Sequence, residues 1–140
     1  MRRYQPVLQI AVVSSCAQTA CDLAERINEH GQFVHVFASA KELCEFPHVQ
    51  VLDLILLERK PGFAMTLNGL RAYLRSVSCY AMLCGVGPAK GLVPAGVDYA
   101  ISIALTDGEL GDILDDVLHT LDGDLPIRRT EDESWQLTCQ

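Results

Sequence analysis

This sequence has no long hydrophobic run, few basic residues and only a brief resemblance to a signal peptide at its start. None of its apolar runs reaches the roughly 18 residues that a membrane span needs. The opening MRRYQPVLQIAVVSS resembles a signal peptide only briefly, because Gln5, Pro6 and Gln9 interrupt it. Eleven basic residues against 18 acidic ones give a formal charge of −7, which disfavours direct binding to nucleic acid or anionic membranes. We therefore expect a cytoplasmic domain that contacts no membrane.

Cysteines are present, but their spacing is not that of a metal site. None of the six forms a C-x-x-C pair, and the four histidines show no ligand spacing. Buried thiols in a reducing compartment are the expected reading. We predict no metal site and no cofactor.

What the sequence does contain is an alternation of strand-like and helix-like segments. Nearly half of the residues are apolar, enough for one domain with a real core. The alternation predicts an α/β fold, a doubly wound five-stranded parallel sheet with helices on both faces. The expected strands cover residues 6–13, 33–38, 51–57, 79–84 and 98–103, and the expected helices 15–30, 39–46, 65–75 and 106–121. The segment 85–96 is rich in glycine and proline, so the fourth helix of the fold should be irregular.

Three helix starts carry a possible capping box, in which a Ser or Thr is followed three residues later by Glu or Gln. The pairs are Ser15 with Gln18, Ser39 with Glu42, and Thr106 with Glu109.

Ligands of an open parallel sheet bind beyond the carboxyl ends of its strands, so these ends carry the functional prediction. The first expected strand ends in Ser14 and Ser15, the third in Glu58, the fourth in Cys84, and the fifth near Ser102. No glycine-rich phosphate loop follows the first strand, one carboxylate stands alone, and no histidine falls at a strand end. We therefore do not expect an enzyme, although a flavodoxin-like enzyme of the same topology is an alternative.

Two stretches resemble the receiver domain of bacterial two-component response regulators (CheY-like). They are DLILLERKPG, similar to that family's third strand and phosphorylation loop, and GVDYAISIALTDGELGDIL, similar to its fifth strand and last helix. The resemblance covers about residues 6–121 and implies the flavodoxin-like strand order 2-1-3-4-5.

The same resemblance implies that the phosphorylation site is degenerate. The family's magnesium-binding acidic pair falls on Ser14 and Ser15, and its phosphoaccepting aspartate falls on Glu58. The switch threonine or serine falls on Cys84, and the lysine falls on Ser102. Two serines do not bind magnesium as two carboxylates do, so a pseudo-receiver that works without phosphorylation is expected.

Several roles for these residues stay open. Glu58 is either a permanent charge that mimics the phosphorylated state, a phosphoacceptor in its own right, or a residue paired with Arg59, Lys60 or solvent. Cys84, with Cys16 near the same sheet edge, suggests a redox or small-molecule sensor in the vacated pocket.

The end of the sequence suggests a domain boundary. Residues 1–122 are expected to form the receiver-like domain, and 123–140 a linker and the start of a missing C-terminal domain. There, ESWQL resembles the entry into an OmpR-type winged-helix DNA-binding domain. This implies the regulatory and dimerising half of a transcription regulator, a homodimer that contacts DNA through the missing part. The last helix, with Asp112, Asp115 and Asp116, is the expected dimer face.

Overall fold

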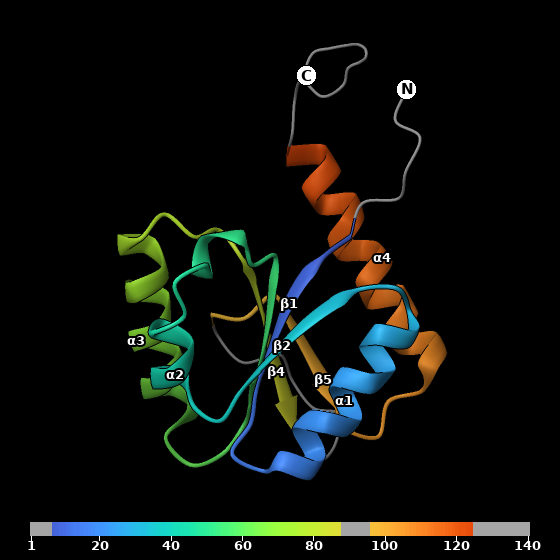
Figure 1. The fold of residues 1–140 in the computed structure, drawn as a ribbon, viewed down its shortest axis with the longest axis horizontal. Coiled ribbons are helices and arrows are strands. Elements are labelled where there is room, and N and C mark those ends of the chain that lie inside the picture. Colours follow the sequence, from blue (N-terminus) through green and yellow to red (C-terminus); the bar gives the residue numbers. More distant parts are fainter. Residues whose placement is uncertain (1–6, 88–95, 125–140) are drawn as a thin grey trace. The chain divides into compact units, whose positions relative to one another are not determined.

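The computed structural model describes residues 7–87 and 96–124, with side chains up to Leu121. The chain divides into two units, residues 8–107 and the terminal segments 1–7 and 108–140. In order, the elements of the first unit are β1 (Gln9–Val13), α1 (Ala17–Glu29), β2 (Phe33–Phe37), α2 (Ala40–Cys44), the 3-10 turn η1 (Val49–Val51), β3 (Leu54–Glu58), α3 (Phe63–Ser76), β4 (Met82–Gly87) and β5 (Tyr99–Ser102) (Figure 1).

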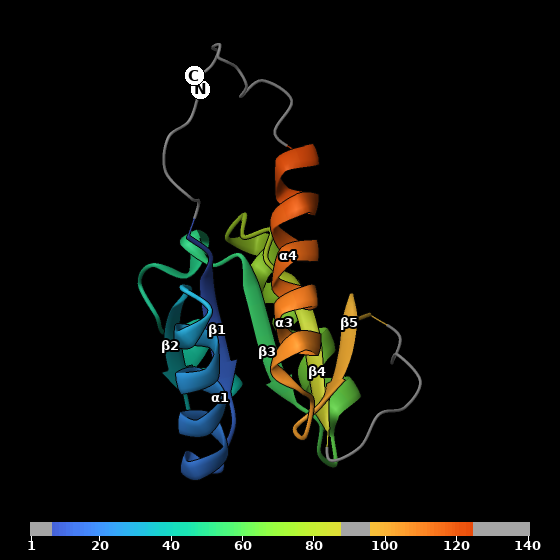
Figure 2. The same ribbon diagram turned by 90° about the vertical axis from the view of Figure 1, so that its right-hand side faces the viewer.

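The sheet of the first unit is parallel throughout, in the order β2-β1-β3-β4-β5. Helix α1 lies on one face, and α2 and α3 lie on the other (Figures 1 and 2). The prediction of a five-stranded, doubly wound, flavodoxin-like sheet is therefore confirmed. The register sets Val13 beside Leu57, Glu58 beside Val86, and Gly87 beside Ser102, so the strand ends share one edge.

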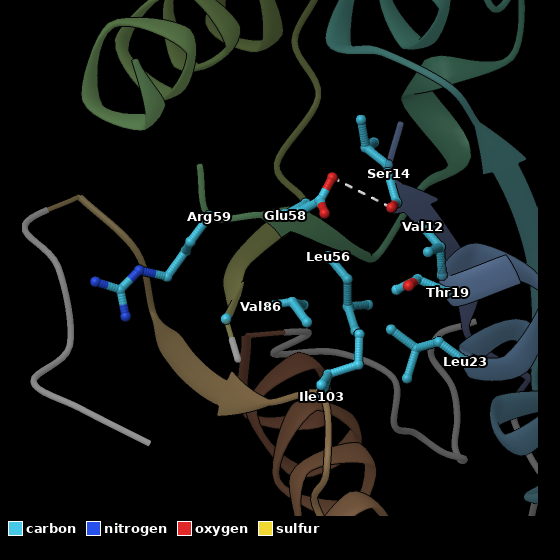
Figure 3. A pocket seen from close by; sticks show the side chains of 11 residues that line it. Val12, Ser14, Thr19, Leu23, Leu56, Glu58, Arg59, Val86 and Ile103 are labelled. Atoms are coloured by element: carbon cyan, nitrogen blue, oxygen red, sulfur yellow. Dashed lines mark hydrogen bonds between the residues drawn. The ribbon is translucent and has the colours of Figure 1, made fainter. Parts of the chain in front are cut away.

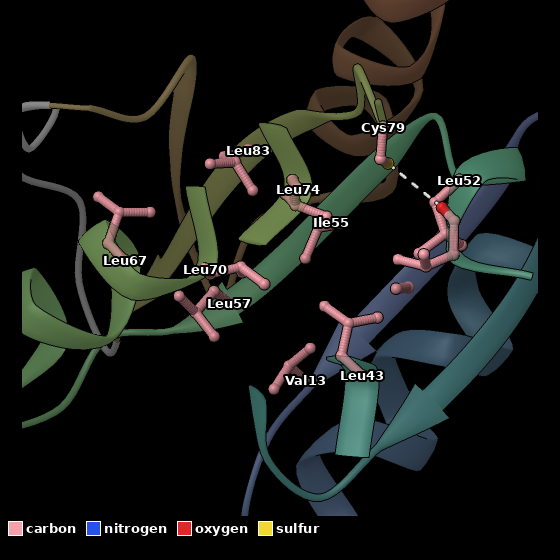
Figure 4. Close-up of a cluster of buried hydrophobic side chains, with 12 residues drawn as sticks. Val13, Leu43, Leu52, Ile55, Leu57, Leu67, Leu70, Leu74, Cys79 and Leu83 are labelled. Carbon is pink, nitrogen blue, oxygen red and sulfur yellow. Dashed lines mark hydrogen bonds between the residues drawn. The ribbon is translucent and has the colours of Figure 1, made fainter. Parts of the chain in front are cut away.

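The two faces of the sheet are buried because the central strands are apolar at nearly every position. On one face, Val13, Ile55 and Leu57 pack in a cluster with Leu43 of α2 and Leu70 of α3 (Figure 4). The alternate strand residues and the apolar stripe of α1 are buried too, namely Ile10, Val12, Leu54, Leu56, Ala20, Leu23 and Ile27. Burial of each Leu or Ile contributes about 1.5–3 kcal/mol.

Side chains close the amino ends of the strands. The Gln9 N–H donates to Asp53 Oδ2 at 2.8 Å, and the Leu83 N–H donates to Asp98 Oδ2 at 2.9 Å. Burial raises the pKa of Asp53, and the Gln9 N–H offsets this in part. The Asp53 side chain therefore gives the Gln9 N–H an acceptor, but burial makes its ionised form unfavourable.

The second unit contains α4 (Asp107–Asp124), which begins at the last residue of the first unit. Leu110, Leu114 and Val117 are buried. Asp112, Asp115 and Asp116 are exposed. Within residues 7–87 and 96–124, no helix is both long and apolar enough to cross a membrane.

One of the three predicted capping boxes needs correction. Helix α1 starts one residue later than the Ser15 capping box implies, with Cys16 as a cap that makes no side-chain hydrogen bond. Ser15 instead turns its hydroxyl toward Glu58, and Gln18 donates to Asp22. A carboxylate across the sheet edge competes successfully for the Ser15 hydroxyl.

The first hydrogen bond of the Ser39 capping box is confirmed, because the Glu42 N–H donates to Ser39 Oγ at 3.2 Å. The Glu42 carboxylate reaches back to the Ala38 N–H at 3.0 Å. At the other helix start, Thr106 and Glu109 stay a prediction.

The fourth strand is the largest correction. It was expected at 79–84 but runs from Met82 to Gly87, so Gly85 and Gly87 are strand residues rather than part of an irregular segment. Gly85 has a packing reason: a Cβ there would lie 3.2 Å from Cδ of Arg59 and 3.3 Å from Cζ of Phe63. The rest of the expected irregular helix, 88–95, lies outside the described residues.

Candidate functional site

The carboxyl edge of the sheet brings together the predicted site residues Ser14, Ser15 and Glu58. Glu58 is the last residue of β3, and Ser14 follows the last residue of β1, its neighbour in the sheet. Ser14 is 6% exposed, Glu58 is half-buried, and Ser15 is exposed. Their meeting point lies just before α1, where backbone N–H groups and the helix dipole favour negative charge.

One carboxylate oxygen of Glu58 accepts all the bonds that join these residues. Oε1 lies 3.2 Å from the Ser14 hydroxyl, 3.2 Å from the Ser15 backbone nitrogen and 3.3 Å from the Ser15 hydroxyl, all three of which are donors. We call this set of contacts the Glu58 latch. It fastens the end of β3 to the loop between β1 and α1.

The Ser14 hydroxyl has two possible acceptors but one hydrogen. Cys16 O lies 3.3 Å from Ser14 Oγ, and Glu58 Oε1 lies 3.2 Å away. The ionised carboxylate is the stronger acceptor, so we assign the hydrogen to Glu58. The oxygen of Ser14 also accepts from the Cys16 N–H at 3.1 Å, so this buried serine organises the whole turn.

Of the roles left open for Glu58, an ion pair with Arg59 or Lys60 is not seen in the structure. Among the described residues, the ion pair within 4.0 Å joins Arg26 to Asp107 instead, at 2.9 Å. Lys60 donates to Ser15 Oγ at 3.2 Å, and the Arg59 side chain points away from Glu58 (Figure 3). The serines hold the carboxylate because they stand directly beside it on the neighbouring loop.

Cys84 is not at the edge of the sheet, which corrects its predicted position. It pairs in register with Leu56, two residues before Glu58, and the residue level with Glu58 is Val86. Cys84 is 1% exposed, and burial, with a smaller effect of the negative Asp98, raises its pKa to about 12. A thiol of this kind is inert, so a sensor built on Cys84 is not supported.

Cys16 fits a reactive thiol better. It is exposed, and the hydroxyl and N–H of Thr19 lower its pKa, although Glu58 opposes this effect. It has no cysteine partner, because the described cysteines are all free.

Ser102 does lie at the edge, as the last residue of β5, but not beside Glu58. Strand β4 separates the two, a distance of about 10 Å across the sheet. The Ser102 hydroxyl oxygen accepts the Ala104 N–H at 3.0 Å. A serine side chain is too short to span two strand spacings, so the edge has no counterpart of the family's lysine at this position.

A pocket of about 280 Å³ opens beside the latch, and we call it the Glu58 pocket. Figure 3 shows Val12, Leu56 and Val86 on the sheet side, with Leu23 of α1 and Ile103 opposite. Among its described lining residues, Thr19, Ser14, Glu58 and Arg59 supply the polar groups. Sequence reasoning missed Thr19, Leu23 and Val86 as site residues, because a strand-end survey finds polar residues and overlooks apolar walls.

The residues at this edge do not fit the magnesium ion that receivers hold. Among the described residues that line the pocket, Glu58 is the one carboxylate, and its Oε1 already accepts the three latch bonds. Magnesium prefers several converging oxygens, mainly carboxylates. In the part of the chain that the structure describes, no three His, Cys, Asp or Glu residues cluster as a metal site would need.

Comparison with solved structures places this fold among receiver domains. The receiver domain of a putative Luxo repressor from Vibrio parahaemolyticus is 12% identical, with 89% of this chain and 100% of that chain covered and a TM-score of 0.69. A CheY-like receiver protein from Methanospirillum hungatei JF-1 is 18% identical, covering 85% and 99%, with a TM-score of 0.68. The N-terminal domain of a response regulator/sensory box/GGDEF protein from Carboxydothermus hydrogenoformans is 15% identical, covering 84% and 98%, with a TM-score of 0.67. At these identities the likeness establishes the CheY-like fold. No family model and no curated protein matches the sequence.

Proposed function

We propose that this chain is the regulatory, receiver-like part of a bacterial transcription regulator, and that it acts without being phosphorylated. The fold supports the first half of the proposal, since the three solved structures described above are receiver domains or parts of response regulators. The Glu58 latch is the single observation that carries the second half.

The latch opposes phosphoryl transfer because it leaves no place for the cation. Phosphoryl transfer needs a cation that offsets charge on the transferring oxygens. Oε1 of Glu58 accepts hydrogen bonds from Ser14 and Ser15 instead, and these serines stand where the family has its magnesium-binding acids. The proposal therefore assigns Glu58 a structural role, as a permanent negative group that holds the loop before α1.

Dimerisation, DNA binding through a C-terminal winged-helix domain and a cytoplasmic location complete the proposal. They rest on the sequence resemblance, and residues 125–140, which carry the winged-helix signature, lie outside the described residues. The exposed Asp112, Asp115 and Asp116 of α4 suit the wet rim of a dimer contact with basic partners.

Acetyl phosphate with magnesium tests the central proposal, with intact mass as the readout. The wild-type chain and Glu58→Asp should both stay unmodified, because neither restores the acidic pair. The triple variant Ser14→Asp, Ser15→Asp, Glu58→Asp is the matched control, since it rebuilds the three acids and should gain one phosphoryl group. A stable phosphoryl adduct on wild-type Glu58 would show that the chain is a genuine phosphoacceptor.

A further inference from the structure

The Glu58 pocket has the character of a ligand site, and it includes Ser14 and Glu58 from the degenerate phosphorylation site. We propose that it binds a small apolar molecule that carries a protonated amine. Such a ligand would give the domain an input that needs neither a phosphodonor nor magnesium.

The walls of the pocket are built from separate elements that converge. Val12, Leu56 and Val86 come from three adjacent strands and form its apolar floor. Leu23 of α1 and Ile103 face them (Figure 3). Ile103 is 39% exposed, so a large apolar side chain stands partly in water at the pocket and would be covered by an apolar ligand.

The charge inside the pocket selects the sign of the ligand. Among the described residues that line it, Glu58 and Arg59 are ionisable, and the Arg59 side chain extends away from Glu58 (Figure 3). None of the described residues donates a hydrogen bond to Oε2 of Glu58, whereas Oε1 accepts three. An ammonium group would give Oε2 a charge-assisted partner beside the apolar walls, and a carboxylate would be repelled.

The surface next to the pocket also favours a positively charged ligand. A second hollow of about 410 Å³ shares Thr19, Leu23 and Ile103 with the Glu58 pocket and adds Asp22 and Glu25 of α1. Its one basic residue, Arg26, is already bonded to Asp107 and to Leu105 O. A cationic molecule would therefore meet a mainly acidic approach.

Two indoles that differ in the charge at the end of the side chain test this. The pocket, at about 280 Å³, is at the small end of ligand sites, so probes of this size are suitable. Tryptamine ends in an ammonium and indole-3-propionate in a carboxylate. Titrated into the ¹⁵N-labelled 140-residue chain, tryptamine should give saturable shifts at the amides of Thr19, Leu23, Val86 and Ile103.

The expected preference is at least about tenfold in Kd for tryptamine, the factor that one charge-assisted hydrogen bond supplies. Glu58→Gln should reduce the preference to about twofold or less, because it keeps the shape and removes the charge. Glu45→Gln is the matched control: it removes the same charge from an exposed site on α2's C-cap and should leave the preference intact. Ile103→Trp should abolish the shifts by filling the pocket.

The affinities of the wild-type chain for the two indoles test the proposal even if a variant fails to fold. Equal affinity for the two indoles, a preference for the carboxylate, or saturation at amides away from these four residues would overturn the proposal. Because the assay contains no phosphodonor, its failure would leave the phosphorylation-independent function untouched.

Discussion

The Ser14 hydroxyl and the Glu58 carboxylate join two neighbouring strands at 3.2 Å, at the edge where a receiver carries its phosphorylation chemistry. Glutamate is one methylene longer than the family's aspartate, and its Oε1 reaches the loop that follows β1. The same oxygen then accepts the Ser15 N–H and hydroxyl. The edge is thereby closed by hydrogen bonds instead of by a metal ion.

The latch should contribute measurably to stability, and mainly through Ser14. Ser14→Ala should lower the free energy of unfolding by about 1–2 kcal/mol, because it removes a buried hydroxyl bonded to a carboxylate and to the Cys16 N–H. Ser15→Ala should cost less than about 0.5 kcal/mol, since that hydroxyl is exposed and the backbone bond remains. Urea unfolding followed by circular dichroism measures both.

A double-mutant cycle of Ser14→Ala with Glu58→Gln isolates the contact itself. A coupling energy near zero would mean that Ser14 stabilises only its own turn.

Asp53 should make stability depend on pH. Its raised pKa means that the folded state binds the proton more tightly than the unfolded chain, so its contribution is greatest in acid and falls as pH rises through the folded pKa. Asp53→Asn keeps an acceptor for the Gln9 N–H without the charge. It should be neutral or stabilising at pH 7, by less than about 1 kcal/mol, and should lose this advantage in acid.

Asp53→Ala is the contrasting variant, because it leaves the Gln9 N–H without its acceptor and should cost about 1–3 kcal/mol. Chemical denaturation of the three proteins from acid to neutral pH provides the comparison. An Asn variant that is least favourable at neutral pH would reverse the assigned direction.

The thiols should differ widely in reactivity. Cys16 is exposed and the pKa of its thiol is lowered by Thr19, while Cys84 is buried with a pKa of about 12. In the folded protein, a disulfide reagent should modify Cys16 at least about a hundredfold faster than Cys84. Peptide mapping after a short reaction shows which site is labelled, with Cys16→Ser and Cys84→Ser as the paired controls. Early labelling of Cys84 would restore it as a sensor candidate.

The strands of this fold were predictable because buried parallel strands are apolar at nearly every position, as LILL in β3 shows. Glu58 and the serines were found for the related reason that polar residues after an apolar run mark its end. Strand β4 was predicted too early in the chain, because its second half contains Gly85 and Gly87, and glycine disfavours a strand. The sequence does not show that Arg59 and Phe63 pack against Gly85 and leave no room for a side chain there.

The hydrogen-bond partners of the Glu58 side chain could not be predicted from the sequence either. Arg59 follows Glu58 directly, and successive side chains of an extended chain point to opposite faces. Lys60 donates to Ser15 Oγ instead, and the serines that bond Glu58 are 43 and 44 residues away in the chain. The apolar pocket was missed for the same reason, since its walls come from four elements and from a residue beyond β5.

The oligomeric state of the chain can be tested directly. The chain should form a homodimer at micromolar concentration without a phosphodonor, because a regulator that reads paired half-sites needs a two-fold partner. Multi-angle light scattering should give twice the monomer mass of 15.4 kDa. Charge reversal by Asp112→Lys with Asp115→Lys should weaken the dimer if α4 supplies the contact, while Glu45→Lys serves as the control. A strict monomer would move the dimer contact to another part of the regulator.

Magnesium titration of the ¹⁵N-labelled chain, followed at the amides of Ser15 and Glu58, is the most direct measurement of the central claim. The Ser15 N–H donates to Glu58 Oε1, so any ion that drew this carboxylate away would shift the Ser15 signal. We predict no saturable shift through the millimolar range, because one latched carboxylate offers too few oxygens. Saturation at millimolar magnesium or below would contradict the account and return the site to the phosphorylatable class.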